Sequence, residues 1–295
     1  MLSGFSTKRT RDIEVGVGDD CAVARLGDTD LVLCADMLVE HIHFETSYFD
    51  PRDIGYKAVA VNLSDIAAMG ANAVYLLCTL SGPKSYPLGE ILTGIQDACD
   101  HYDISLVGGD ISRSAEITAS VSVIGTRETH TSLLRSKASP GDEIVLTGPT
   151  GLSAAGLRSL SQKRTRPMHP SLFELAHLRP LPLLKAGRAA LSHGVKAGID
   201  ISDSLALDLH RVSDASDVGF ELSHIPIVDG VSPEEALFGG EDYELLLFTK
   251  DGASLAALLD EILERAAATV IGVVTEDKDL RTLRGKPLPK KGFLH

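Results

Sequence analysis

Short apolar runs and alternating apolar and polar positions predict interspersed strands and helices in the first half of the chain. The longest helical segment, residues 51–71, is apolar on most faces, which is typical of a buried helix; Pro51 begins it and Gly70 ends it. A second helix, at 87–103, has one apolar face. Strands are expected at residues 13–17, 21–26, 30–39, 73–82, 104–107 and 116–126.

A small, polar, turn-forming stretch from Ser136 to Glu143 predicts a domain boundary, with residues 1–137 in one domain and 138–295 in the other. Both halves mix strands and helices, so the expected fold class is α+β or mixed α/β with two domains. A helical segment in the second half breaks around Pro180 and Pro182. In that half, strands are expected at 143–148, 218–223, 268–274 and within 239–249, and helices within 148–160, 173–194, 198–216 and 254–268.

Composition and charge restrict the class of protein. The chain has 295 residues, a formal net charge of −13, 5% aromatic residues and no tryptophan, which disfavours binding to nucleic acid or to an anionic membrane. Its four cysteines form no CxxC pair, and the N-terminal segment lacks the apolar stretch of a secretion signal. No apolar run approaches the roughly 20 residues of a membrane helix. We therefore expect a reduced, cytoplasmic protein with neither nucleic-acid nor membrane partners.

Six acidic turns adjoin apolar segments, where a carboxylate is costly unless it is paired, hydrogen-bonded or bound to a metal. Mg²⁺ prefers carboxylate oxygens and commonly binds substrate phosphates as well, so converging turns of this kind would form a multi-metal nucleotide site. Each turn taken alone is also an ordinary connection between strands. Their acidic residues are Asp19, Asp20, Asp36, Asp65, Asp110, Asp200, Asp203, Glu241 and Asp242.

Asp65 is the most informative of these residues, because it lies within the apolar helix and on the same side as Asn62. A buried carboxylate beside a buried amide needs a partner. That partner is either a ligand or a group that caps or hydrogen-bonds within the core, and the sequence leaves both interpretations open.

Two other patterns point less directly to chemistry. The glycines of Gly108-Gly109-Asp110 follow an expected strand, where paired glycines let the backbone approach a phosphate. His41 and His43 alternate and would share a face of an extended segment; without a third ligand, a surface strand pair is favoured over a two-histidine metal site. The motifs GxxxxGK[ST], dinucleotide-binding GxGxxG, GxSxG and HExxH and the protein-kinase motifs are absent from the chain.

Taken in order, the acidic turns resemble those of the thiamine-monophosphate kinase family, in the superfamily of aminoimidazole-ribonucleotide synthetase, selenophosphate synthetase and the hydrogenase-maturation ATPases. The resemblance implies the two-domain aminoimidazole-ribonucleotide synthetase-like fold. In that fold the N-terminal domain binds ATP and metals and contributes a sheet to the barrel of a homodimer, and ATP and several Mg²⁺ lie between the domains. The resemblance is carried by GVGDDCAV, DPRDIGYKAVAVNLSDIAAMGA, SLVGGDISR, SPGDEIVLTGPTGLSAAGL, HLRP, GIDISDS and GGEDYEL, with KKGF near the C-terminus.

The same resemblance implies roles for individual residues. The implied metal ligands are Asp20, Cys34, Ala35, Asp36, Asp65, Asp110, Asp200 and Asp203. The implied ATP contacts are Gly109, Asp110, Arg135 and Ser202, and the implied thiamine contacts are His43, Glu241 and Phe293. His43 is then a substrate contact and not a metal ligand.

The chain departs from the family pattern at three positions. Ser or Thr followed by Thr usually precedes the aspartate Asp36, where this chain has Cys34 and Ala35, so a hydroxyl ligand is absent although backbone carbonyls remain. The family's DxSDG is here DISDS, with Ser204 in place of glycine. If that position required a positive φ, serine would cost about 1 kcal/mol there.

The implied reaction is ATP-dependent phosphorylation of thiamine monophosphate to thiamine diphosphate by direct in-line transfer with several Mg²⁺. The attacking phosphate oxygen is already deprotonated, so positioning and charge neutralisation suffice and no catalytic side chain is expected. The alternatives are another ATP-dependent synthetase of the superfamily and a catalytically impaired nucleotide-binding homologue, suggested by Cys34, Ala35 and Ser204. Cys21 within its acidic turn does not fit a selenophosphate synthetase, and KKGFLH lacks the terminal cysteine of a hydrogenase-maturation ATPase.

Overall fold

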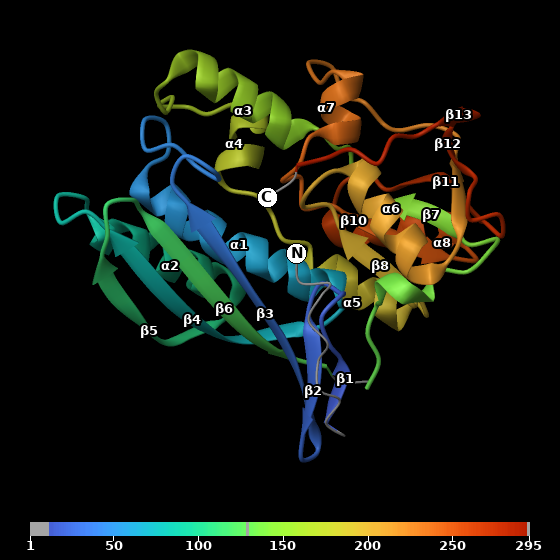
Figure 1. The fold of residues 1–295 in the computed structure, drawn as a ribbon, viewed down its shortest axis with the longest axis horizontal. Coiled ribbons are helices and arrows are strands. Elements are labelled where there is room, and N and C mark those ends of the chain that lie inside the picture. Colours follow the sequence, from blue (N-terminus) through green and yellow to red (C-terminus); the bar gives the residue numbers. More distant parts are fainter. Residues whose placement is uncertain (1–11, 128–129, 294–295) are drawn as a thin grey trace.

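The computed structural model describes residues 12–127 and 130–293, which form two mixed sheets and their helices (Figure 1). The first sheet has the order β1-β2-β3-β6-β4-β5 and is antiparallel except between β4 and β5. Its strands are β1 (Ile13–Val15), β2 (Ala22–Leu26), β3 (Thr29–Val39), β4 (Asn72–Gly82), β5 (Ser105–Arg113) and β6 (Thr118–Thr126).

The second sheet has the order β13-β12-β9-β11-β7-β10-β8, with β12 parallel to β9 and the other pairs antiparallel. With a mixed sheet in each half, the structure confirms the mixed α/β class. The strands are β7 (Glu143–Leu146), β8 (Ala197–Asp200), β9 (Gly219–Leu222), β10 (Leu245–Thr249), β11 (Thr269–Thr275), β12 (Arg281–Leu283) and β13 (Lys286–Pro287).

Helices pack on both sheets, and none within the described residues has the length and apolar character needed to cross a membrane. The expected break at Pro180 and Pro182 is confirmed, because one helix ends before it and the next begins after it. The helices are α1 (Pro51–Ala68), α2 (Leu88–Tyr102), α3 (Leu152–Lys163), α4 (Leu172–Leu178), α5 (Leu184–Ser192), α6 (Leu205–Ser216), α7 (Pro233–Phe238) and α8 (Gly252–Leu263), with a 3₁₀ turn at Arg135–Lys137.

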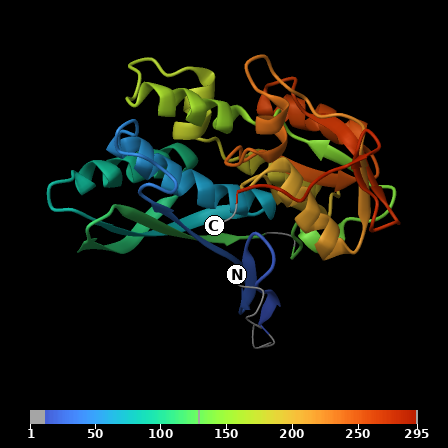
Figure 2. The ribbon, with the colours of Figure 1, turned by 45° about the horizontal axis from the view of Figure 1, so that its top comes forward.

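Helices α1 and α2 cover one face of the first sheet, and Figure 2 shows both on the same side of it. Residues along β4 alternate: Leu76 and Leu80 are fully buried, whereas Tyr75 and Leu77 are 47% and 40% exposed. Successive side chains of a strand point to opposite faces, so Tyr75 and Leu77 lie on the face away from α1. Met37, which is opposite Ser120 on β6, is 52% exposed. This second face therefore presents apolar side chains to solvent.

Helix α1 lies between the two halves of the molecule and is buried over almost its whole length, as its apolar sequence predicts. It approaches its neighbours through glycines. A Cβ on Gly187 of α5 would lie 1.9 Å from the carbonyl oxygen of Ala67, and a Cβ on Gly94 of α2 would lie 2.1 Å from that of Arg52. The close α1–α5 contact joins the halves, and one apolar cluster runs through both of them.

Four local expectations need correction. Strand β5 continues through Gly109 and Asp110 instead of ending before them: the register with β4 shifts at Val107, and Gly109 and Asp110 then pair with Cys78 and Thr79. Residues 41–43 form turns and not an extended segment. The segment 198–216 was expected to contain a turn and a helix, but its first residues, 198–200, form the end of β8. Helix α7 was not expected, although Ser232 and Glu235 form the capping box that its SPEE sequence encodes.

Substituting Gly187 with alanine is expected to lower the free energy of unfolding by about 1–3 kcal/mol, because the new methyl group would force α5 away from the backbone of α1. Gly89→Ala is the matched control: Gly89 is exposed in α2, and nothing lies within 4 Å of its added Cβ. The control should leave stability unchanged or raise it by up to about 1 kcal/mol. Denaturant unfolding measures both, and equal stabilities would contradict the tight α1–α5 contact.

Candidate functional site

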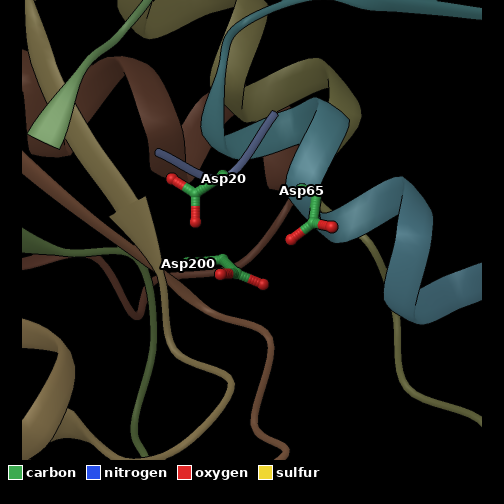
Figure 3. A group of neighbouring side chains, drawn as sticks. All are labelled: Asp20, Asp65 and Asp200. Atoms are coloured by element: carbon green, nitrogen blue, oxygen red, sulfur yellow. The ribbon is translucent and has the colours of Figure 1, made fainter. Parts of the chain in front are cut away.

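Three aspartates from distant parts of the chain meet between the two halves. Asp20 lies in the turn before β2, Asp65 in the last turns of α1 and Asp200 at the end of β8. One carboxylate oxygen from each lies within 4.8 Å of the others. Figure 3 shows the three side chains pointing toward one another. The structure thus brings together three of the eight expected metal ligands.

The three carboxylates are electrostatically unfavourable as a group. Burial raises the pKa of Asp65 well above its usual range, and the neighbouring Cys34 and Asp36 add to the shift. Burial and the Asp20 charge likewise raise the pKa of Asp200, although its Oδ2 accepts a hydrogen bond of 2.5 Å from the Ser64 hydroxyl. Hard carboxylate oxygens at this spacing fit a divalent cation such as Mg²⁺, which would offset their repulsion.

Arg135, an expected ATP contact, forms an ion pair with Asp20 of this cluster. Its Nη2 lies 2.5 Å from Asp20 Oδ1, and its backbone N–H donates to Asp19 Oδ2 at 3.3 Å. Burial and the neighbouring Asp20 charge raise the pKa of Asp19 to about 7, which Arg135 only partly offsets. Arg135, which is expected to bind ATP, is therefore paired in this structure with Asp20, which is expected to bind a metal ion.

The expected metal ligands on strand β3, at positions 34–36, differ in their hydrogen bonds and in the face of the sheet on which they lie. The Cys34 thiol donates to the Asn62 carbonyl oxygen at 3.4 Å, and the Asp36 N–H donates to Asn62 Oδ1 at 2.9 Å. Asn62 therefore hydrogen-bonds within the core, whereas Asp65 faces other carboxylates. Ala35 is opposite Ser122 on β6, so its side chain lies on the sheet face away from α1. A ligand role for Ala35 would be limited to its backbone.

Asp110 and Gly109 lie within β5 and outside the three-aspartate cluster. Gly109 has φ 157°, and a Cβ there would lie 1.7 Å from the Cys78 carbonyl oxygen, so the close approach of β5 to β4 requires glycine at this position. Asp110 is exposed and accepts a 3.0 Å hydrogen bond from the Ser112 hydroxyl. The sequence pointed to a close approach of the backbone to a phosphate here; in the structure the close neighbour of Gly109 is the backbone of β4.

The turn at residues 200–204 is held rigidly at the start of α6. Asp208 Oδ2 accepts from the backbone N–H groups of Asp203 and Ser204, both at 3.0 Å, and Arg211 forms ion pairs with Asp203 and Asp208. Burial raises the pKa of Asp208 to about 6. Ser204 has φ 170°, an extended conformation without strain, and its hydroxyl accepts from Leu207 N–H to cap α6. The cost considered for serine at this position does not arise.

Two expected thiamine contacts converge on this same turn. The Glu241 N–H donates to the Ser202 carbonyl oxygen at 2.7 Å, and the Phe293 N–H donates to that of Asp203 at 3.1 Å. The Ser204 hydroxyl also donates to the Lys291 carbonyl oxygen at 2.9 Å, which holds the C-terminal segment in place. Expected metal, ATP and thiamine residues are therefore adjacent around residues 200–204.

The third expected thiamine contact, His43, lies in a turn where its Nδ1 accepts from the Val39 N–H at 3.0 Å. Its neighbour His41 instead pairs with Glu45 at 3.0 Å, so the two histidines do not act as a strand pair. The shared face expected for them was wrong, because His41 has φ 68° and turns the chain.

Two residues of the site were missed in the sequence. The Nζ of Lys57 lies 2.7 Å from Glu241 Oε1, and His177 Nδ1 lies 3.3 Å from Glu241 Oε2. Burial and the charge of Lys57 lower the pKa of His177 to about 3, so its ring is neutral. Lys57 could have been noticed in the sequence, because it is a lysine within a mostly apolar helical segment. His177 is the first residue of HLRP, and nothing in that motif indicated that it would contact Glu241.

Comparison with known proteins places the whole arrangement in a family. Residues 18–127 match the N-terminal domain of AIR synthase related protein, and residues 139–283 match its C-terminal domain. The chain is 39% identical to the thiamine-monophosphate kinase of Bacillus subtilis, covering 79% of this chain and 77% of that protein. It is 37% identical to the Escherichia coli enzyme, covering 96% and 92%.

The fold agrees with a solved relative. AaThiL complexed with AMPPCP and TMP superimposes with a TM-score of 0.81 and 30% sequence identity, covering 94% of this chain and 90% of that one. The two domain matches confirm the expected aminoimidazole-ribonucleotide synthetase-like architecture. From its similarity over most of its length, the chain belongs to the thiamine-monophosphate kinase family of the AIR synthase related proteins.

Proposed function

We propose that this protein transfers the γ-phosphoryl group of ATP directly to thiamine monophosphate, giving thiamine diphosphate and ADP. The observation that carries this proposal is the convergence of Asp20, Asp65 and Asp200. They lie beside the turn that contains Ser202, to which the backbone of Glu241 is hydrogen-bonded. The relatives named thiamine-monophosphate kinases and the AaThiL complex with AMPPCP and TMP support it.

Several Mg²⁺ ions are part of the proposal. Asp20, Asp65 and Asp200 would hold the first, because their oxygens already lie within 4.8 Å of one another. Further ligands would come from Asp36, Asp110 and Asp203 and from the backbone at Cys34 and Ala35. When bound, Mg²⁺ neutralises phosphate charge and lowers the repulsion between the two anionic substrates.

The remaining side chains position the substrates for in-line attack. A phosphate oxygen of thiamine monophosphate forms the new bond to the γ-phosphorus while the bond to the ADP oxygen breaks, and no general base is required. Gly109, Arg135 and Ser202 would contact ATP, and Arg135 would exchange its Asp20 partner for phosphate oxygens. His43, Glu241 and Phe293 would contact the thiamine moiety.

A homodimer formed through the first sheet also belongs to the proposal. Its open face carries the exposed apolar residues Met37, Tyr75 and Leu77, and a contiguous exposed apolar surface commonly marks an interface.

The proposed domain boundary between residues 137 and 138 lies at the end of the 3₁₀ turn that precedes β7. A reduced, cytoplasmic setting is proposed from the four cysteines, all of which are free.

Formation of thiamine diphosphate from ATP, Mg²⁺ and thiamine monophosphate, measured by chromatography, is the direct test. Asp65→Asn should reduce kcat by about 100-fold or more, because it removes charge at the point where phosphate charge must be neutralised. Asp229→Asn, at an exposed aspartate of the second half, should leave kcat unchanged. ATP binding without turnover of thiamine monophosphate would contradict the kinase and support the nucleotide-binding alternative.

Mg²⁺ should raise the thermal midpoint of the wild-type protein, by the equivalent of about 2.7 kcal/mol at a concentration 100 times its Kd. The shift should be smaller at pH 5.5 than at pH 8. Burial raises the pKa of Asp65 and Asp200, so Mg²⁺ must displace protons there and binds less well as pH falls. Scanning calorimetry of wild type and Asp65→Asn measures this, and an equal shift in both proteins would exclude Asp65 as a ligand.

Replacing Leu77 with lysine should convert the homodimer to a monomer, because an ammonium group on the open sheet face cannot be buried against an apolar partner. Met168→Lys is the control, since Met168 is 86% exposed but lies on the loop after α3. Analytical ultracentrifugation of the three proteins distinguishes the outcomes. A monomeric wild type, or a Leu77→Lys variant that stays dimeric, would show that this face is not the interface.

A further inference from the structure

Lys57 is the largest fully buried side chain of helix α1 and has 0% exposure. Removing an ammonium group from water costs several kcal/mol unless it is paired and hydrogen-bonded. Residues 58–61 that follow it are apolar, and an uncharged side chain of similar volume, such as methionine, would avoid the cost of burying a charge. The charge of Lys57 therefore needs an explanation in terms of its partners.

Those partners are two of the residues expected to contact thiamine. Lys57 Nζ lies 2.7 Å from Glu241 Oε1 and donates to the His43 carbonyl oxygen at 3.3 Å. It also lies 5.4 Å from the centre of the Phe49 ring, within the range of a cation–π contact. His43 comes from the first half of the chain and Glu241 from the second, so one buried ammonium group joins the two.

Glu241 itself is held at several points. Its backbone has φ 66°, an uncommon conformation for a residue with a Cβ, and its N–H donates to the Ser202 carbonyl oxygen. The carboxylate has one oxygen against Lys57 and the other 3.3 Å from His177 Nδ1, while that nitrogen also lies 3.1 Å from the Ser153 hydroxyl. The orientation of the carboxylate is thus determined from both sides.

The same carboxylate remains able to bind a ligand. The Glu241 side chain is 25% exposed, although Lys57 beneath it is fully buried. An ionised carboxylate has about four acceptor positions. The contacts with the Lys57 ammonium group and the His177 ring leave some of these positions available to a ligand. Burial opposes ionisation of Glu241, but the charge of Lys57 holds its pKa below the usual range, so the carboxylate presents acceptors only.

We propose that Lys57 is a positioning residue for the thiamine moiety: it fixes the Glu241 carboxylate against the His43 turn and so determines affinity for thiamine monophosphate but not for ATP. This inference rests on the proposed kinase function and adds a residue that touches neither substrate. Its effect passes mainly through Glu241, because the contact at 2.7 Å is charged whereas the contact to His43 is to a neutral carbonyl.

The test compares wild type with Lys57→Met, Glu241→Gln and the double variant. Calorimetry gives the Kd for thiamine monophosphate and for a non-hydrolysable ATP analogue, and steady-state assays give both KM values. Lys57→Met should weaken thiamine monophosphate about 10-fold or more, the usual effect of losing a hydrogen bond to a charged group, with ATP-analogue binding within about twofold of wild type.

The double variant separates positioning from folding. Lys57→Met leaves Glu241 partly buried without its cation and should lower the thermal midpoint, whereas the double variant removes both charges and should recover it. Affinity for thiamine monophosphate should not recover: it should equal that of Glu241→Gln alone, because both changes act on one carboxylate. Affinity that recovers together with stability would show that Lys57 is only structural and would overturn the inference.

Lys163→Met is the matched control. Lys163 also lies 2.7 Å from a buried glutamate, Glu174, but at the end of α3. It should leave both affinities unchanged. If wild type forms no thiamine diphosphate, the proposed function fails, while the calorimetric comparison still decides the inference. Equal affinity of wild type and Lys57→Met for thiamine monophosphate, or no binding by wild type, overturns it.

Discussion

The pairing of charges buried along helix α1 is the constraint on which the rest of the structure depends. Asp53 is fully buried and forms ion pairs with Arg166 and Arg179, each at 2.5 Å. Four residues further along the helix, Lys57 forms an ion pair with Glu241. Residues four apart share one side of a helix. Helix α1 therefore meets the second half of the chain through complementary charges, and neither half could bury its own charges without the other.

The same interface creates the acidic cluster. Ser64 donates to Asp200 at 2.5 Å across 136 residues of sequence, and Asp65 meets Asp20 and Asp200 one residue further along the helix. These carboxylates are close because α1 is fixed against α5 by the glycine contact at Gly187 and against the GGED turn by Lys57. The pKa values of Asp65 and Asp200 are raised because burial and the neighbouring acidic groups disfavour their ionised forms, and pKa shifts of this kind are common at functional sites.

The departures from the family pattern have different structural meanings. Ser204 is accommodated without strain, and its hydroxyl makes two hydrogen bonds, one that caps α6 and one that holds the segment before Phe293. Cys34 directs its thiol to the Asn62 carbonyl oxygen and adds to the electrostatic shift of Asp65. The serine thus contributes to order around the site, whereas the cysteine changes the chemistry of a position beside the carboxylates.

Short sequence patterns were sufficient to predict the elements that depend only on neighbouring residues. The buried character of α1, its start at Pro51 and the break before α5 follow from hydrophobic periodicity and proline geometry, and the acidic turns were visible as candidate ligands. Even α7 was encoded locally, in the capping box of Ser232 and Glu235. Tertiary structure alone decided that β5 continues through Gly109, that Asp110 lies apart from Asp20, Asp65 and Asp200, and that Lys57 faces Glu241. Periodicity and turn chemistry act over a few residues, whereas the partner of a buried charge is set by which distant segments pack against it.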